Sequence, residues 1–373
     1  MKFRNTDMDE FKKIIQYKKI VCYGAGGTLR EFCLLYHFLE IQDKIIYIMD
    51  GNEDKNGTFY ELMKTKIPVI SVQDFLEKKE KNYVILLSCL NADEPYEKLN
   101  RIQAMEEVEC FYTEFLKFQT KEKEERNRIY PSDYRISDIQ KIPKKIHYCW
   151  FGGKPIPEKN RIWMESWKKY CPDYEIIEWN EANYDVGKCA FMRQAYDAKA
   201  WGFVPDYARL DIIYHYGGIY LDIDVEIIKN PDDLLYQDGF CGIDCSKKIS
   251  LGLGFGAVKG SHLLKELLNV YETLRFDARE KTASPTFESN IYKQFGYVEN
   301  GNLQCIDGMT VYPEKVLSGK DNGVGLISAT SETFFIHHYD ASWCSEEQIA
   351  SRDRMHLFYK MISQEEGKQY NGA

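Results

Sequence analysis

The sequence predicts a mixed α/β protein built from two units, and the order of its segments carries this prediction. Residues 1–118 alternate short apolar strands with amphipathic helices, the pattern of a small, parallel, Rossmann-like sheet. Residues 119–140 are polar and highly charged, and predict a linker or an exposed connecting helix. Strands and helices resume over residues 141–345, and a C-terminal tail, residues 346–373, is helical in pattern up to residue 360.

The composition is that of a globular protein with a surplus of acid. Of 373 residues, 44% are hydrophobic and 29% are charged, so the chain can bury a core without disulfides or a structural metal. With 49 Lys and Arg against 58 Asp and Glu, the net charge is −9. Bulk charge therefore does not favour nucleic acid as a partner. An anionic substrate would have to be held locally or through a metal cation.

The cysteines and the N-terminus bear on the compartment. Eleven cysteines are scattered without a CxxC pair, which argues against a zinc site and fits reduced thiols. Residues 1–19 lack the apolar core of a signal peptide, and no apolar stretch approaches the roughly 18 residues of a bilayer span. We expect a cytoplasmic protein, and peripheral association with the inner face of the membrane stays open.

The first unit contains a glycine turn in a strand–turn–helix context. Expected strands and helices alternate over residues 18–24, 28–40, 45–49, 69–70, 72–79 and 83–88. Gly24, Gly26 and Gly27 lie between the first strand and the first helix, where backbone N–H groups cradle phosphate in nucleotide-binding folds. Asp50 ends the next strand, where an acid can bind a ribose. However, Leu29 stands where the third glycine of G-x-G-x-x-G belongs, so nucleotide binding and a ligand-free scaffold are both open, and no NAD-dependent reaction is predicted.

The second unit contains an acidic strand. Expected elements cover residues 145–151, 161–170, 174–179, 189–200, 204–216, 219–228 and 261–274, with short strands near residues 311 and 335. Alternation along residues 219–228 places one set of polar side chains on a single face: Tyr220, Asp222, Asp224 and Glu226. Carboxylates this close repel one another unless a cation lies among them. Oxygen ligands suit Mg²⁺ or Mn²⁺, and such an ion could hold a diphosphate. The alternative to a metal site is an edge strand whose acidic face is exposed to solvent.

The helix before this strand adds a charged pair. Asp206 and Arg209 lie one turn apart on one helix face. They form either a surface ion pair, worth less than about 1 kcal/mol, or a pair that points toward the same cleft as the acids. Gly217 and Gly218 end the helix and let the backbone turn sharply or pass close to a ligand.

Three segments together resemble glycosyltransferase family 32. They are residues 205–224, with Pro-Asp-Tyr-Ala-Arg and Tyr-Gly-Gly-Ile-Tyr-Leu-Asp-Ile-Asp, residues 146–153, Ile-His-Tyr-Cys-Trp-Phe-Gly-Gly, and Ile336-His337-His338-Tyr339 with Ser342-Trp343. They span residues 142–345 in the right order, which is more specific than any one motif. The resemblance implies a GT-A fold, a UDP- or GDP-linked sugar donor, a glycan or lipid-linked glycan acceptor in bacterial surface polysaccharide synthesis, and retention at the anomeric carbon.

The resemblance also implies roles for individual residues. Asp222 and Asp224 would hold Mn²⁺ or Mg²⁺ and the donor diphosphate, with Asp224 favoured for direct coordination, and Arg209 would offset charge on the leaving group. His337 or His338 would complete the metal shell. The implied donor-binding residues are Trp150, which would stack on the base, Asp206, Arg209, Gly217, Gly218 and Tyr220. His147 is expected to make structural hydrogen bonds rather than act as a base.

Two other functions fit part of the pattern. A haloacid-dehalogenase-type phosphatase would use Asp222 as nucleophile and Asp224 as acid/base, but it usually carries the motif on the first strand of its domain. An inactive sugar-nucleotide-binding protein is the non-enzymatic alternative. A glycoside hydrolase fits less well, because its two carboxyl groups must lie about 5 Å or more apart across the substrate.

Overall fold

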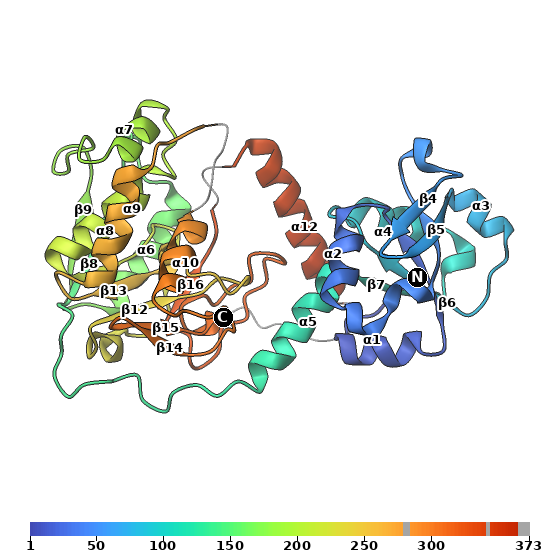
Figure 1. The fold of residues 1–373 in the computed structure, drawn as a ribbon, viewed down its shortest axis with the longest axis horizontal. Helices are drawn as coiled ribbons and strands as arrows, with labels where there is room; N and C mark the ends of the chain where they lie inside the picture. The colour runs from blue at the N-terminus through green and yellow to red at the C-terminus, as the bar shows by residue number, and fades with distance from the viewer. Residues whose placement is uncertain (279–283, 341–343, 365–373) are drawn as a thin grey trace. The chain divides into compact units, whose positions relative to one another are not determined.

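A computed structural model describes residues 1–278, 284–340 and 344–364. The chain divides into two compact α/β units, each with its own sheet, which confirms the predicted class (Figure 1). The first unit comprises Met1–Arg128, Gly323–Leu326 and Glu346–Ala373, and the second comprises Ile129–Asn322 and Ile327–Ser345. The chain thus crosses between units four times, after residues 128, 322, 326 and 345.

The first unit is built from short strands separated by helices. Its elements are β1 (Lys2–Phe3), α1 (Met8–Ile15), β2 (Lys19–Tyr23), α2 (Gly27–Leu35), β3 (Ile45–Met49), β4 (Phe59–Leu62), β5 (Thr65–Ile70), α3 (Val72–Glu77), β6 (Tyr83–Leu87), α4 (Asp93–Asn100), β7 (Glu109–Tyr112), α5 (Thr113–Arg126) and α12 (Glu346–Gln364). They form one sheet in the order β1-β7-β6-β2-β3-β5-β4. All pairs are parallel except β4 with β5. The order reverses at β2, the doubly wound arrangement expected of a Rossmann-like sheet.

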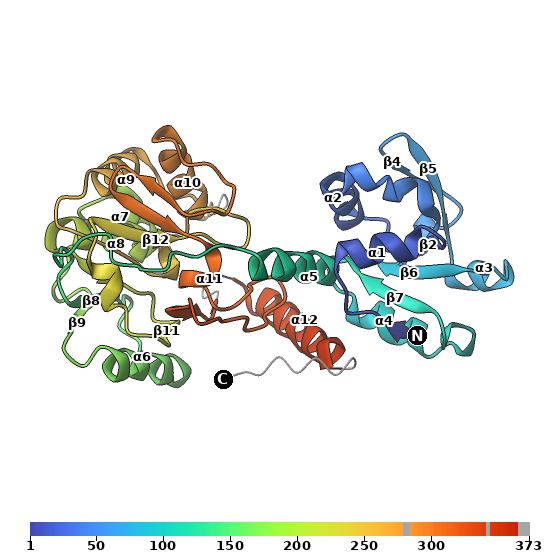
Figure 2. The ribbon, with the colours of Figure 1, turned by 90° about the horizontal axis from the view of Figure 1, so that it is seen from below.

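Alternate residues of the central strand face two separate cores. On β2, Ile20 and Cys22 pack with α1 and α2, whereas Val21 and Tyr23 pack with the cluster that includes α4 and α12. Figure 2 shows α1 and α2 on one side of β6 and β7, and α4 on the other. Burial on both faces explains why these strands read as continuous apolar runs in the sequence.

The boundaries of the first unit differ from those predicted. Residues 119–126 belong to α5, whose buried Phe115 and Phe118 tie it to the core, so the irregular connection begins at residue 127. The expected tail is not a separate element, because α12 supplies Phe358 and Tyr359 to the core of the first unit. Tyr359 stacks on Tyr112, with ring centroids 5.6 Å apart. The sequence pattern indicated the helix but not its partner.

The second unit carries a mixed sheet. Its elements are β8 (Lys145–Cys149), α6 (Glu158–Tyr170), β9 (Glu175–Trp179), α7 (Ala190–Asp197), α8 (Val204–Tyr216), β10 (Gly218–Tyr220), β11 (Val225–Ile227), β12 (Gly239–Gly242), β13 (Phe255–Ala257), α9 (His262–Thr273), α10 (Ser284–Gln294), β14 (Gln304–Ile306), β15 (Met309–Tyr312), α11 (Glu314–Leu317) and β16 (Phe335–His337). Seven strands run in the order β14-β15-β12-β13-β10-β8-β9, and β11 pairs with β16 in a separate ribbon. β8 is parallel to both β9 and β10, and β13 is antiparallel to β10 and β12.

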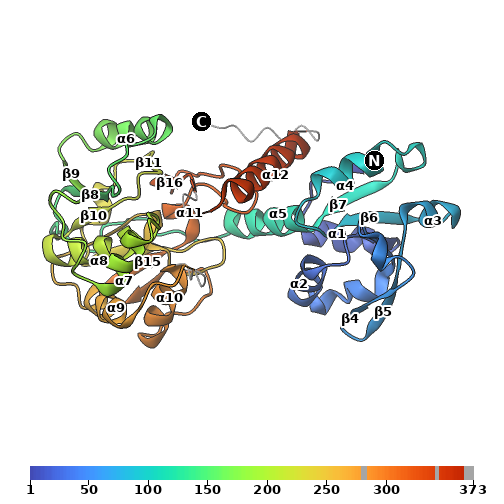
Figure 3. The same ribbon diagram turned by 90° about the horizontal axis from the view of Figure 1, so that it is seen from above.

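Helices cover both faces of this sheet. One core packs α7, α8, α9 and α10 together, and a second contains Trp167 of α6 with residues of β11 and β16. Figure 3 shows α6 on the side opposite to α7–α10. The Trp167 indole N–H donates to Val225 O at 2.8 Å, and Ser166 Oγ accepts from Ile227 N at 2.9 Å. Helix α6 therefore fixes β11, the strand that directly follows the Asp-x-Asp sequence.

The predicted continuous strand over residues 219–228 is wrong. β10 ends at Tyr220 and β11 begins at Val225, and Val225 N donates to Asp222 O at 3.0 Å across the turn between them. Register with β13 and β8 ends where the chain leaves the sheet, and β11 instead pairs with β16, from Val225–His337 to Ile227–Phe335. The two aspartates therefore lie in a turn rather than on one strand face.

His147 on β8 links the end of α8 to the sheet. Trp179 Nε1 donates to its Nδ1 at 3.1 Å, so Nε2 carries the proton and donates to Gly217 O at 3.0 Å. The backbone of Gly218, with φ +113°, passes close to β8, because a Cβ at this position would lie 2.9 Å from Lys145 O. Burial, opposed by the bond to Gly217, lowers the pKa of His147 to about 4. The ring has the structural role that the sequence predicted.

Within the described residues, none of the helices combines the length and the apolar character that crossing a bilayer would require.

Replacing Tyr359 with Ala should destabilise the first unit. The ring is 3% exposed and stacks between Tyr112 and Phe115, so its loss should cost about 3–5 kcal/mol. Leu357→Ala is the matched control: at 69% exposed, it should change stability by less than about 0.5 kcal/mol. Urea unfolding followed by circular dichroism measures both, and equal effects would contradict the packing described for α12.

His147→Gln should flatten the acid dependence of stability. The folded state resists protonation of a ring whose unfolded pKa is near 6.5, so stability is full above that pH and is lost as the pH falls toward 4. Between pH 7 and pH 5 the wild type should lose about 2 kcal/mol more than the variant. Calorimetry at both pH values measures this difference, with exposed His37→Gln as the control. An unchanged slope in the His147 variant would exclude a buried neutral ring.

Candidate functional site

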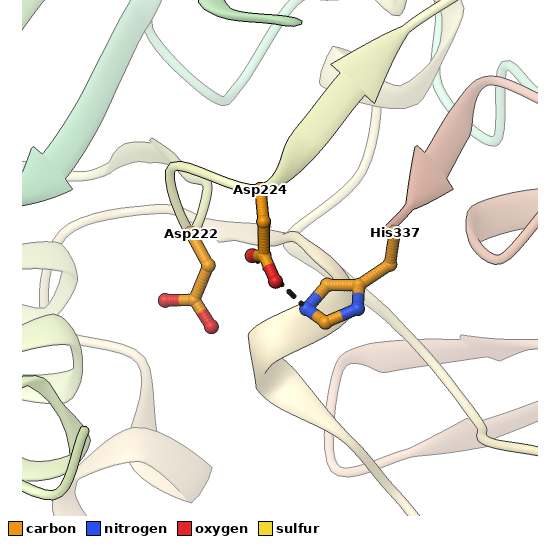
Figure 4. Close-up of side chains that lie close together, drawn as sticks. All are labelled: Asp222, Asp224 and His337. Carbon is orange, nitrogen blue, oxygen red and sulfur yellow. Dashed lines mark ion pairs between the residues drawn. The ribbon is translucent and has the colours of Figure 1, made fainter. Parts of the chain in front are cut away.

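Asp222 and Asp224 lie in the turn between β10 and β11, and their carboxylates converge with a histidine. One ligand atom each from Asp222, Asp224 and His337 lie within 4.8 Å of one another. Figure 4 shows the three side chains pointing toward a common space, with His337 reaching in from β16. The side chain of Asp222 is 29% exposed and that of Asp224 is 12% exposed. The cluster is therefore enclosed on most sides but accessible through Asp222.

The segment after β16 wraps around Asp224. His337 Nε2 lies 3.4 Å from Asp224 Oδ1. The backbone N–H of Asp340 donates to Asp224 Oδ2 at 2.8 Å, and that of His338 donates to Asp224 O at 2.8 Å. The Asp340 carboxylate in turn accepts from buried Asn160 of α6 at 2.8 Å. Asp224 is consequently held by contacts from a segment more than a hundred residues away.

Arg209 of α8 carries a buried positive charge beside the cluster. Its side chain is 4% exposed, and its Nη2 lies 2.8 Å from Asp206 and 3.0 Å from Glu288. Its Nη1 lies 3.8 Å from Asp222 Oδ2. Ser284 also accepts a hydrogen bond from Nη2 at 2.7 Å. The predicted Asp206–Arg209 pair exists, but the surface interpretation is wrong, because the pair is buried and reaches the acidic cluster.

Burial shifts the titration of these acids. It raises the pKa of Asp206 to about 7, against the opposing effect of Arg209. It also raises the pKa of Asp222 and of Glu288, again opposed by Arg209, and the charge of Asp224 adds to the shift of Asp222. Arg209 thus favours the charged form of each of these three carboxylates, together with Tyr220 and His337 at Asp222 and with Leu251 N and Ser284 at Glu288.

A glycine loop lies against Asp222. A Cβ at Gly252 would lie 2.8 Å from Asp222 Oδ2 and 3.4 Å from Arg209 Nη1. Gly252 lies in the short 3₁₀ turn Leu251–Leu253, and Leu251 N donates to Glu288 Oε2 at 2.9 Å. Only a glycine lets the backbone approach the carboxylate this closely without a shift.

The structure gives Tyr220, Gly217 and Gly218 supporting positions. The hydroxyl of Tyr220 is buried and donates to Asp222 Oδ1 at 3.0 Å. Gly217 and Gly218 are buried; Gly218 packs against Lys145 and His147, and Gly217 against Pro143, Ala257 and Lys259. Tyr220 therefore contacts Asp222 directly, whereas the two glycines pack against other parts of the chain, and donor binding by these three residues stays a prediction.

His338 does not join the cluster, which corrects its prediction as a metal ligand. Its ring stacks on Trp163, with centroids 4.0 Å apart and planes 6° apart, and its Nε2 lies 2.9 Å from Glu226 Oε2. Glu226 is thereby also separated from the two aspartates. His337 is the last residue of β16 and His338 follows the strand, and of these two rings only that of His337 lies beside Asp224.

Other predicted positions lie outside the cluster. Trp150 follows β8, is half-buried, and donates its indole N–H to Lys154 O, so base stacking by Trp150 stays a prediction. Ser342 and Trp343 lie outside the described residues.

In the first unit the structure brings the glycine turn and Asp50 together. Asp50 Oδ2 accepts from Ala25 N at 2.7 Å and from Lys55 Nζ at 3.0 Å. Despite burial, the hydrogen bonds from Asn52, Ala25 and Lys55 lower the pKa of Asp50. Gly24, with φ +110°, packs against Ser88, whereas a Cβ on Gly26 or Gly27 would meet open space. Asp50 thus braces the turn, and nucleotide binding there stays a prediction.

Sequence reasoning missed Glu288, Gly252 and Asp340. Glu288 lies one turn before Ile291 and Tyr292 and is the one acid among the buried residues of α10, and an acid on the buried side of a helix is a usable signal of a buried charge. Gly252 and Asp340 act through backbone proximity, for which the sequence carries no pattern.

The donor set fits a hard divalent cation. Two carboxylates and one imidazole are accepted by Mn²⁺, and an ion would relieve the repulsion between Asp222 and Asp224. His337 receives an N–H bond from Tyr339 at Nδ1, 3.2 Å, so presenting a free Nε2 to an ion requires moving its proton to Nδ1 and giving up that bond.

Comparison with known proteins finds similarity in the part of the chain that contains these site residues. Residues 157–241 match the family described as "Glycosyltransferase sugar-binding region containing DXD motif". The chain is similar to inositol phosphoceramide mannosyltransferases 1 and 3 of Schizosaccharomyces pombe, at 31% identity over 114 and 148 residues. These matches cover 28% and 38% of this chain, and 34% and 40% of the relatives.

Among solved structures, the PaToxG glycosyltransferase matches with a TM-score of 0.35 and 16% identity, covering 43% of this chain and 71% of that one.

The family match contains α8, Asp206, Arg209 and the Asp222–Asp224 turn. Residues 157–241 are therefore similar to a glycosyltransferase sugar-binding region with a DXD motif, in line with the resemblance to family 32.

Proposed function

We propose that the second unit is a divalent-metal-dependent glycosyltransferase. It moves a hexose from a UDP- or GDP-linked donor to a hydroxyl of a glycan or lipid-linked glycan, as in the synthesis of bacterial surface polysaccharide. The observation that carries the proposal is the convergence of Asp222, Asp224 and His337 beside the buried charge of Arg209. The names of the relatives make nucleotide-linked mannose the first donor to test.

In this proposal the residues of the site have different roles. Asp222 and Asp224 would hold Mn²⁺ or Mg²⁺, and the ion would supply positive charge for the departing diphosphate. Tyr220 orients Asp222, and the Asp340 N–H orients Asp224. Arg209 adds fixed positive charge, and because it is already buried and oriented, its charge costs no reorganisation during the reaction.

The surroundings favour attack on the donor's leaving-group face, which gives retention. A double displacement needs a free carboxylate as nucleophile. Asp206 and Glu288 are both paired with Arg209, at 2.8 and 3.0 Å, and are therefore poor nucleophiles. The acceptor hydroxyl attacking beside the leaving diphosphate needs no such group.

Asp224→Asn should abolish turnover. Loss of one carboxylate removes both a ligand and half of the charge that holds the ion, so nucleoside diphosphate release with Mn²⁺ should fall by at least about 100-fold. The matched control is Glu226→Gln, two residues away but bonded to His338, which should keep activity within about threefold. A donor panel of UDP- and GDP-hexoses is the assay.

The same assay decides among the alternatives. A phosphatase would release phosphate from simple esters and leave nucleotide sugars intact. An inactive binding protein would bind a donor without turnover. Full activity of Asp224→Asn would refute the assignment of the site.

His337→Ala and His338→Ala should behave differently although they are neighbours. His337 either binds the ion or orients Asp224, so its loss should weaken Mn²⁺ binding by about tenfold or more. The His338 ring packs on Trp163, so its loss should leave the affinity within about twofold. Titration of free Mn²⁺ by electron paramagnetic resonance measures both affinities. Equal losses, or a greater loss at His338, would contradict the arrangement of β16.

A further inference from the structure

We infer that Glu288 is a positioning residue that fixes Asp222 through Arg209 and through the backbone at Gly252. The inference rests on the proposed function, because it takes Asp222 as a metal-holding group. Glu288 lies on α10, outside the matched sugar-binding region of residues 157–241, and its side chain is 0% exposed. A buried carboxylate without a stabilising partner would be strongly unfavourable, so its contacts show what it does.

The first contact controls Arg209. Glu288 Oε1 lies 3.0 Å from Nη2 of Arg209, and Asp206 shares the same nitrogen at 2.8 Å. These two acids hold the guanidinium so that Nη1, its other terminal nitrogen, stays 3.8 Å from Asp222. Because Asp206 and Glu288 hold Arg209, the guanidinium can stabilise the negative charge of Asp222 without forming a direct hydrogen bond to it.

The second contact controls the glycine loop. Glu288 Oε2 accepts from Leu251 N at 2.9 Å, and the next residue along the helix, Ser289, accepts from Ile249 N at 2.9 Å. These bonds anchor the chain immediately before Gly252, whose Cα hydrogens face Asp222 Oδ2 closely enough that a Cβ would lie 2.8 Å away. The Glu288 carboxylate therefore positions both groups that lie against Asp222: the guanidinium of Arg209 and the backbone at Gly252.

A glutamine cannot replace both contacts. Its amide has one acceptor oxygen and an NH₂ group, so either Arg209 or Leu251 loses its acceptor. Removing the charge also leaves Arg209 shared between Asp206 and Asp222. A closer Arg209–Asp222 pair would then compete with a divalent ion for the carboxylate.

The test compares Mn²⁺ affinity in three full-length variants by paramagnetic resonance titration, alongside donor turnover. Glu288→Gln should weaken Mn²⁺ binding by about tenfold. Glu288→Asp keeps the charge and two acceptor oxygens but is one CH₂ group shorter and cannot reach both partners equally well, so it should lose part of the affinity and still bind more tightly than Glu288→Gln. Ser289→Ala is the matched control: it loosens the same loop without touching Arg209, and should stay within about twofold of the wild type. Thermal unfolding establishes that each variant is folded.

The outcomes separate this inference from the proposed function. Wild-type affinity in Glu288→Gln overturns it, and so does an equal loss in Ser289→Ala, because loop packing alone would then explain the effect. If Glu288→Gln does not fold, wild-type affinity in Glu288→Asp overturns the inference and a partial loss supports it. Failure of the proposed function looks different: the wild type, and not only the variants, would bind no Mn²⁺ and turn over no nucleotide sugar.

Discussion

The burial of Arg209 is the constraint on which the rest of the site depends. An unpaired guanidinium inside a protein is unfavourable by several kcal/mol, so α8 can carry it only where acids meet it. Asp206 comes from the preceding turn of the same helix, and Glu288 arrives from α10. Asp222, at 3.8 Å, contributes a third and looser carboxylate. Charge pairing therefore connects two helices to the Asp-x-Asp turn. Most of the rest of the unit is held by apolar packing instead.

The other half of the site is held by backbone bonds. Asp224 receives N–H groups from His338 and Asp340, and β11 is held by the side chains of Trp167 and Ser166 from α6. Asp222 is thus positioned by buried charges and by the nearby Gly252, whereas Asp224 is positioned by the paired strands β11 and β16 and the segment that follows β16. Two acids separated by one residue are positioned by different parts of the fold, and this keeps their carboxylates together despite their repulsion.

The sequence carries much of this arrangement because part of it is local. The period of α8, the spacing of Asp206 and Arg209, and the Asp-x-Asp pair all lie within residues 204–224, so each could be found from the sequence, but spacing left open whether the Asp206–Arg209 pair faces solvent or the acids. The strand break at residues 221–224 was not predictable in this way, because Leu221, Val225 and Ile227 are all buried and continue the apolar pattern. The turn depends on pairing with β16, about 110 residues later. The same sequence separation hid Asp340, and it left open which of His337 and His338 lies beside Asp224.

The order in which the chain crosses between its units has a consequence for biosynthesis. Domains generally fold as they leave the ribosome, N-terminal first. Here the first unit has its α4-side core lined by Val324, Leu326, Phe358 and Tyr359, residues made after nearly all of the second unit. The part synthesised first is therefore the last to be finished, and a nascent chain would carry an open aromatic surface throughout elongation. Because each unit combines separate stretches of the chain, a single genetic crossover cannot exchange one unit for another.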